Sequence, residues 1–281
     1  MMRRKAIVAL RQISILAISF IALIVTTVAP AHAQQLMVYP TRLTFEGSVR
    51  TAQVQLFNRG TEDATYRISI IRMRMDEKGG MERVTEPLPG EHFADELIRF
   101  SPRQVVIPPS GTQTVRVQLR KPAELAAGEY RSHLLFQALP SAARIVKPTD
   151  DRGLQVTLRP IVSISIPLIV LQGATTSTIA IEHAELHAPT KKGEKNSISF
   201  ELARDGSRST YGDITISRKI GRSPETIIAQ MRGVAIYSPN LRRLFRIPVT
   251  GPTDGELSIS FRETREKGGG ASARVSLANT R

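Results

Sequence analysis

The chain has 281 residues, no cysteine and a formal net charge of +14. This length suits one large domain or two domains of ordinary size. Without cysteine, disulfides, thiolate nucleophiles and cysteine-based metal sites are excluded. Aromatic residues make up 5% of the chain and tryptophan is absent, so the basic residues lack the stacking platforms of nucleic-acid binders. The charge therefore favours an anionic surface or an acidic or carboxylate-bearing partner, and we expect no nucleic-acid partner.

The first 33 residues have the pattern of a secretory signal peptide. Basic residues at 3, 4, 5 and 11 accompany an apolar stretch at 13–28, and PAHA at 30–33 offers a cleavage site after Ala33. We expect export and a mature chain of formal charge about +10, because four basic residues leave without an acid. An uncleaved anchor is the alternative, although the apolar stretch falls short of the roughly 20 residues that span a bilayer. After cleavage we expect no stable membrane insertion.

From residue 34 onward, short stretches of alternating apolar and polar residues end at Gly, Pro, Asn or Asp. A period of two predicts β-strands and not helices. In the first half we expect strands at 52–56, 66–70, 105–107, 115–119 and 129–138, then a polar surface loop at 141–153. Short strands with turns about every ten residues are typical of a β-sandwich.

The longest alternating run, residues 154–166, predicts one strand of about 40 Å that ends before Pro167. Its apolar side consists of Leu154, Val156, Leu158, Pro160, Val162, Ile164 and Ile166. Proline cannot donate to a ladder, so Pro160 indicates that part of the strand lies at a sheet edge. An open apolar edge recruits other chains. The apolar side can equally be ordinary sandwich core, which we expect in part for Ile164 and Ile166.

We place a domain boundary after Gln172, where the chain enters a Gly, Ala, Thr and Ser segment. Seven more strands are expected at 179–186, 197–202, 213–216, 231–237, 244–249, 257–261 and 273–277, which fits a second sandwich. The predicted chain is all-β, with a signal peptide at 1–33 and β-sandwich domains at 34–172 and 173–281.

The sequence carries no nucleotide-binding loop and no nucleophile motif, so we expect no enzyme, no catalytic residue and no cofactor. His183 and His187 are four apart, a metal-binding spacing on a helix; on a strand they are surface histidines that share one face, and we expect no metal. An exported hydrolase on a sandwich scaffold is another class, which would require a pocket with convergent titratable groups.

Seven short segments, taken in this order along the chain, resemble motifs of a known family. They are YPTRLTFEG at 39–47, VQLFN at 54–58, FSP at 100–102, IPPSGTQTVR at 107–116, GEYRSH at 128–133, GSRSTYGD at 206–213 and YSP at 237–239. Together they resemble the PapD-like periplasmic chaperones of chaperone-usher pilus systems, over nearly the whole mature chain. ISIPLIV at 164–170 resembles the archaic branch of that family. The resemblance implies two immunoglobulin-like sandwiches in an L or boomerang arrangement, a periplasmic location and no cofactor.

The resemblance also implies a function. In the family, the last strand of the first domain completes the unfinished sandwich of a pilus subunit, which then passes to an outer-membrane usher. Here residues 154–166 would be that strand, its backbone would supply the ladder, and its side chains would fill the subunit groove. The groove-filling side chains would be Leu154, Val156, Leu158, Val162 and Ile164.

In the family, two basic residues anchor the C-terminal carboxylate of the subunit. Arg42 matches the first by motif, and its other interpretation is an edge charge that opposes aggregation. The second is a lysine on the long strand; aligning the final proline with Pro167 places Val162 there. Arg159 is the candidate replacement, although its offset puts it on the other side of the pleat.

The leading hypothesis is a periplasmic chaperone that donates an edge strand to pilus or fimbrial subunits and delivers them to an outer-membrane usher. The alternative is a secreted immunoglobulin-like adhesion or structural module that assembles through the same edge. Such a module needs no basic anchor.

Overall fold

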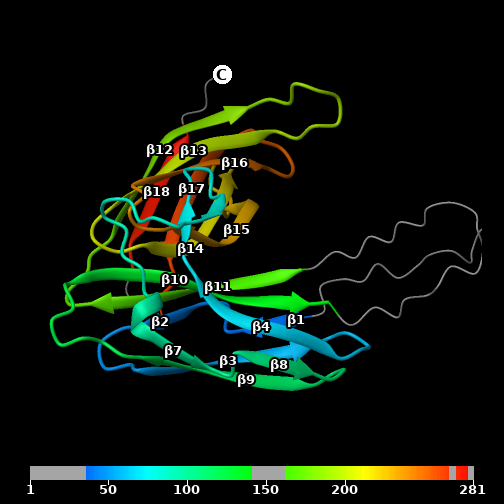
Figure 1. Ribbon diagram of the computed structural model, residues 1–281. Coiled ribbons are helices and arrows are strands. Elements are labelled where there is room, and N and C mark those ends of the chain that lie inside the picture. Colours follow the sequence, from blue (N-terminus) through cyan, green and yellow to red (C-terminus); the bar gives the residue numbers. More distant parts are fainter. Residues whose placement is uncertain (1–35, 141–161, 266–269, 278–281) are drawn as a thin grey trace, which may run out of the picture. The chain divides into compact units, whose positions relative to one another are not determined.

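A computed structural model describes residues 36–140, 162–265 and 270–277, drawn in colour in Figure 1. Within these ranges the regular structure consists of strands, joined by turns and loops, and a single 3₁₀ turn, Asp95–Leu97. None of the helical residues described makes a segment long and apolar enough to cross a bilayer. The all-β class is confirmed, and each of the expected strands that falls within these ranges is present. The predicted signal peptide and the loop expected at 141–153 lie outside them.

The first sandwich stacks a four-stranded sheet on a five-stranded sheet, and Figure 1 shows β10 and β11 above β3 and β9. The first sheet runs β1 (Leu36–Tyr39), β3 (Thr51–Asn58), β9 (Thr112–Leu119) and β7 (Ile98–Ser101). The second runs β2 (Leu43–Phe45), β11 (Ser163–Gln172), β10 (Gly128–Leu139), β4 (Ala64–Ile71) and β8 (Gln104–Ile107). Fully buried side chains such as Phe45, Leu56 and Phe136 fill the space between the sheets. The alternation seen in the sequence thus corresponds to inward and outward side chains.

The second sandwich pairs a three-stranded sheet with a four-stranded one. They comprise β12 (Thr178–His187), β13 (Ser197–Asp205) and β16 (Arg242–Pro248), and then β15 (Thr226–Ile236), β14 (Thr210–Lys219), β17 (Glu256–Glu263) and β18 (Ser272–Leu277). Between Glu182 and Glu185 the pairing of β12 shifts at a bulge by one residue. His183 lies within this bulge at a φ of 52° and is exposed, and His187 is half-buried and contacts the Ser199 hydroxyl at 2.6 Å.

The first strand of the chain changes sheets. Its β1 half pairs with β3, whereas its β2 half pairs in parallel with β11 through Leu43↔Leu168 and Phe45↔Val170. The crossover between the halves contains Arg42. The change of sheet therefore places this arginine immediately before β2 begins to pair with β11.

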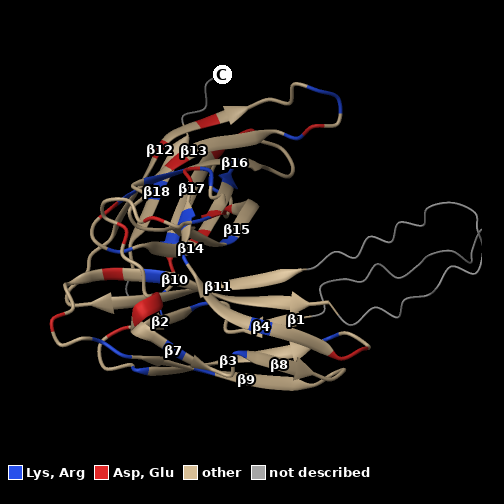
Figure 2. Cartoon of the chain, viewed as in Figure 1, with Lys and Arg blue, Asp and Glu red and all other residues tan. Residues whose placement is uncertain are grey.

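β11 does not end before Pro167 as expected, but runs from Ser163 to Gln172. β10 pairs along one side of the whole strand, and β2 occupies the other side at residues 168–170. Among the described strands none pairs with residues 163–167 on that other side. A proline is tolerated within the strand because no neighbour there requires its missing N–H. Within the described ranges the first half of β11 is thus an open edge, and Figure 2 shows the strand free of charged residues.

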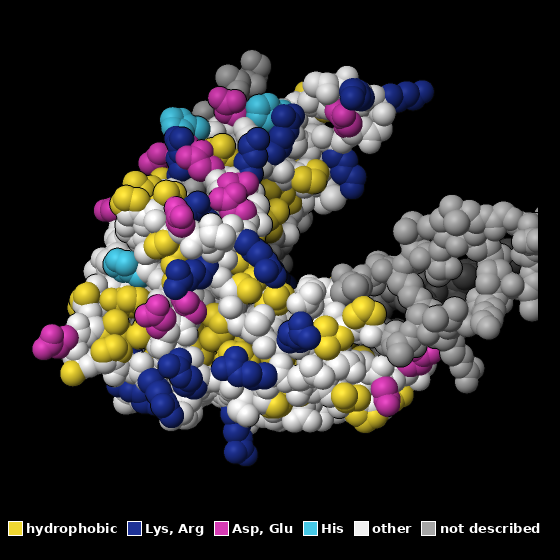
Figure 3. Space-filling model, in the orientation of Figure 1, with side chains coloured by type: hydrophobic (Ala, Val, Ile, Leu, Met, Phe, Trp, Pro, Cys, Tyr) yellow, Lys and Arg dark blue, Asp and Glu magenta, His cyan; other side chains and the backbone are white. Residues whose placement is uncertain are grey.

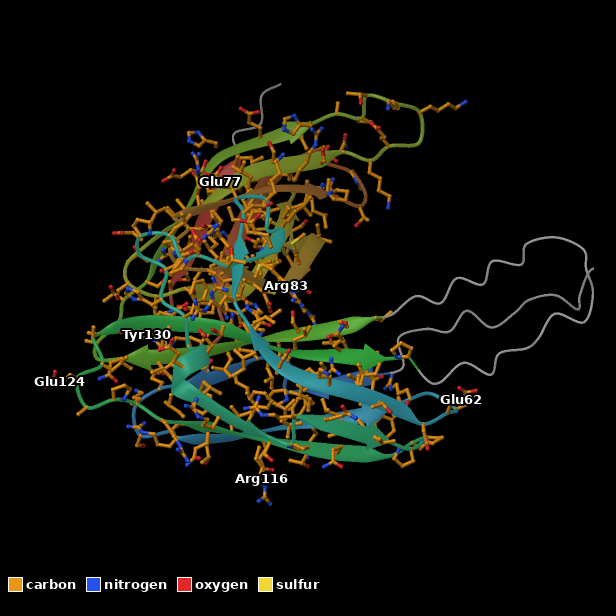
Figure 4. The ribbon with its side chains drawn as sticks, viewed as in Figure 1. Glu62, Glu77, Arg83, Arg116, Glu124 and Tyr130 are labelled. Atoms are coloured by element: carbon orange, nitrogen blue, oxygen red, sulfur yellow. The ribbon has the colours of Figure 1, made fainter. Side chains whose placement is uncertain are left out.

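A small hairpin of β5 (Met73–Met75) and β6 (Met81–Arg83) joins the two sandwiches within the single compact unit to which the described residues belong. Figure 4 labels Glu77 in the turn between its strands. The Glu77 carboxylate pairs with Arg242 at 2.7 Å, and the Glu77 carbonyl accepts from the Leu244 amide at 2.7 Å. A small apolar cluster that includes Met75, Ile169 and Tyr237 packs beside these contacts.

Candidate functional site

Arg42 is held between side chains of the second sandwich. Its guanidinium carbon lies 4.0 Å from the ring centroid of Tyr211, and its Nη2 donates a 3.4 Å hydrogen bond to the Tyr237 hydroxyl. Its Nε is buried and has no hydrogen-bond partner within the described part of the chain. No acid of the described residues forms an ion pair with it. Arg42 thus combines a charge that no described acid neutralises with an unused Nε donor, which suits a carboxylate.

Tyr237 also contacts two side chains of β10. The Arg131 guanidinium carbon lies 4.3 Å from its ring centroid, and the His133 ring meets it edge-on at 6.0 Å. Burial, followed by the positive charges of Arg131 and Arg42, lowers the pKa of His133 to about 3. His133 is therefore neutral at physiological pH, and the two arginines carry the charge of this cluster.

A cavity of about 320 Å³ adjoins Arg42. Ile169 and Leu171 of β11 line it, with Thr44 and Glu46 on the side of β2. Tyr211 of β14 and Arg265, just beyond β17, belong to the opposite wall. The remaining lining residues are Tyr39, Pro40, Thr41, Val49, Glu129, Arg208, Ser209, Glu263 and Thr264.

The other charges that line this cavity are already satisfied. Arg265 pairs with Glu46 at 2.9 Å, and the buried Arg208 forms a bidentate pair with Glu263. The Glu129 carboxylate accepts hydrogen bonds from the Ser209 hydroxyl and, at 2.6 Å, from the Ser209 amide. The other described charged side chains that line the cavity thus have an ion-pair partner or, for Glu129, hydrogen-bond donors. Arg42 differs from them, because no described acid pairs with it.

The described part of the predicted strand keeps the expected alternation. Ile166 is 2% exposed and lies in the first core, and Ile164 packs partly against that core. Val162, on the same side, is 49% exposed. The apolar side therefore passes from the core into solvent at the start of β11, which leaves Val162 available to a partner.

Four of the predicted site residues lie outside the described ranges: Leu154, Val156, Leu158 and Arg159. Their roles stay predictions, as do those of Val162 and Ile164 in filling a groove. Tyr211 and Tyr237 escaped the sequence analysis, although both lie in segments that carried the resemblance. Alternation placed Tyr237 at the end of an expected strand and Tyr211 just before one, and nothing local indicated that they meet Arg42 across more than 160 positions.

The outer face of the four-stranded sheet of the first sandwich is polar and basic. Arg99, Arg116 and Gln53 are exposed there, and Figure 4 shows Arg116 pointing away from the sheet. Basic side chains gather over β7 and β9 at the lower edge of Figure 3. One face of an antiparallel sheet commonly contacts water, so these basic side chains need no binding role. Arg116 serves below as a control for Arg42.

Comparison with known proteins gave matches among solved structures. No family model matches the chain, and no curated protein matches it. The chaperone-tip adhesion subunit complex CsuC-CsuE from the archaic chaperone-usher Csu pili of Acinetobacter baumannii is 13% identical, with 86% of this chain and 98% of that chain covered and a TM-score of 0.45. The Escherichia coli chaperone DraB is 10% identical (86% and 95% covered, TM-score 0.44), and the Pseudomonas aeruginosa CupB2 chaperone is 11% identical (85% and 98%, 0.42). The similarity to these chaperones extends over most of the length of this chain.

Proposed function

We propose that this protein is a periplasmic chaperone that binds pilus or fimbrial subunits by strand addition and delivers them to an outer-membrane usher. The observation that carries the proposal is the open edge of β11 at residues 163–167, which leads directly to Arg42. The exposed backbone groups of such an edge are a template for another strand.

The parallel pairing of β2 with β11 serves as the guide for the direction of the added strand. A strand laid on the open edge of β11 meets β2 where Leu43 pairs with Leu168, one residue beyond Arg42. If this strand runs parallel to β11, as β2 does, its C-terminus lies beside Arg42. The free guanidinium then receives the terminal carboxylate in a charge-assisted contact.

The side chains of β11 contribute the second part of the binding. An unfinished sandwich exposes an apolar groove, which drives aggregation until the groove is filled. Val162 continues the apolar side beyond the core and is exposed in the free chain. This side would fill the groove while the backbone pairs, with Leu154, Val156 and Leu158 extending it as the sequence predicts.

Capture from periplasmic extracts of the protein's own host tests the proposal, with Arg42→Ala beside wild type. We expect wild type to retain small β-rich subunits and Arg42→Ala to retain about ten- to a hundredfold less, because a hydrogen bond to a charged group contributes about 1.5–3 kcal/mol. Bound chains are identified and measured by mass spectrometry.

Arg116→Ala is the matched control, since it removes an equal charge from a face that is remote from β11. It should retain as much subunit as wild type. Equal retention by Arg42→Ala would contradict the anchor. Recovery of only further copies of this chain would instead support the self-assembling module.

A further inference from the structure

The cavity lies beyond the C-terminal end of the subunit strand that we propose to pair with the open edge of β11. Along the direction of β11, the open edge ends at Pro167, and the cavity is lined by the next residues of the strand that face away from the first core, Ile169 and Leu171. Thr44, two residues after Arg42, lines its side. A chain whose carboxylate reaches Arg42 therefore has its last side chain at the mouth of this cavity.

The cavity wall is mixed, and its charged groups other than Arg42 are already paired or hydrogen-bonded. Its apolar part contains Ile169 and Leu171, and Tyr39 and Tyr211 present aromatic rings. The three carboxylates in the lining already have partners, so none is left to bind a basic side chain. At about 320 Å³ the space lies at the lower end of ligand pockets, which suits one large side chain and not several residues.

We propose that this cavity receives the side chain of the C-terminal residue of the bound subunit and selects an aromatic or large aliphatic residue there. The inference rests on the proposed function, since Arg42 must hold the carboxylate. It adds a specificity element: Arg42 recognises the end of the chain, and the Tyr39, Tyr211, Ile169 and Leu171 surfaces recognise its last side chain.

Synthetic peptides test the selection on the full mature chain. Fluorescently labelled 12-residue peptides of alternating apolar and polar residues would differ only in the last residue, which is Phe, Leu, Ser or Lys. We expect the Phe and Leu peptides to bind about tenfold more tightly than the Ser peptide, from the burial of one large apolar side chain. The Lys peptide should bind no better than the Ser peptide, and fluorescence anisotropy gives each Kd.

Thr44→Phe fills the cavity from β2 and should reduce the advantage of Phe over Ser to about twofold or less. Its matched control is Thr51→Phe, which places the same ring on the exposed face of β3 and should leave the advantage intact. Thermal unfolding of both variants verifies that each is folded. If Thr44→Phe still binds the Phe peptide about tenfold more tightly than the Ser peptide, this cavity does not receive the last side chain.

The outcomes separate the two levels of the proposal. Peptides that bind through their carboxylate, shown by about tenfold weaker binding of the C-terminal amide, but are indifferent to the last residue would overturn the cavity assignment alone. Equal binding of acid and amide would contradict the Arg42 anchor, and with it the path into the cavity. Failure of every peptide to bind would contradict both.

Discussion

Replacing Val162 by Asp should lower the recovery of subunits from periplasmic extracts by about a hundredfold or more. Val162 is 49% exposed in the free chain and continues the side of β11 that includes Ile164 and Ile166. In the proposed complex it enters an apolar groove, where an unpaired carboxylate costs several kcal/mol. The free chain should lose little, since exposed substitutions usually change stability by less than about 0.5 kcal/mol.

Ser163→Asp is the control for this experiment. Ser163 is the exposed neighbour on the opposite side of the strand, so it receives the same charge without directing it into the groove. We expect its recovery of subunits to stay within about threefold of wild type. If Val162→Asp recovers as much as Ser163→Asp, this side of β11 does not fill a groove.

Acidification should destabilise the protein through His133. Burial, with Arg131 and Arg42 nearby, lowers the pKa of folded His133 to about 3, whereas the unfolded value is about 6.5. Unfolding therefore takes up a proton between these values, and stability falls as pH falls from about 6.5 towards about 3. At pH 4, which lies about 2.5 pH units below the unfolded pKa and above the folded one, about 3 kcal/mol is lost relative to pH 7.

His133→Phe should remove this contribution. The ring keeps its place against Tyr237 and has no proton to gain, and the buried Nδ1, which has no partner among the described residues, disappears. Urea unfolding at pH 7 and pH 4 measures the effect, with the exposed His92→Phe as control. We expect the loss of stability between the two pH values to shrink by about 3 kcal/mol in His133→Phe only. An unchanged loss would show that His133 is not the group that titrates.

The strands of this protein follow from its alternating side chains. Val54 and Leu56 point inward in β3, and Ile214 and Ile216 do so in β14, because a period of two puts every second side chain on one face of a sheet. Glycines and prolines end most strands where expected, since local backbone preferences act without tertiary contacts. The resemblance of the segment at 39–47 to a family motif identified Arg42 as a candidate anchor for the C-terminal carboxylate of a subunit.

Local rules were insufficient wherever a strand's environment depended on a neighbour distant in sequence. Pro167 lies within β11 because β2 begins to pair only at Leu168, and the alternation of β12 is interrupted at a bulge beside Glu182. A proline or a bulge is tolerated or rejected according to the partner strand, which no short segment specifies.

The surroundings of Arg42 show most clearly that tertiary contacts, and not local sequence, determine this site. Its motif indicates a basic residue near a strand end, but Tyr211 and Tyr237, which hold its guanidinium, come from the second sandwich. The depressed pKa of His133 and the pairing of the cavity carboxylates likewise arise only when distant strands exclude water around them. Sequence alone determined most of the strands and the two-sandwich class, and the resemblance supplied the anchor candidate. The open edge, the free charge and the cavity beside it were decided by packing, because burial and pairing depend on which segments meet.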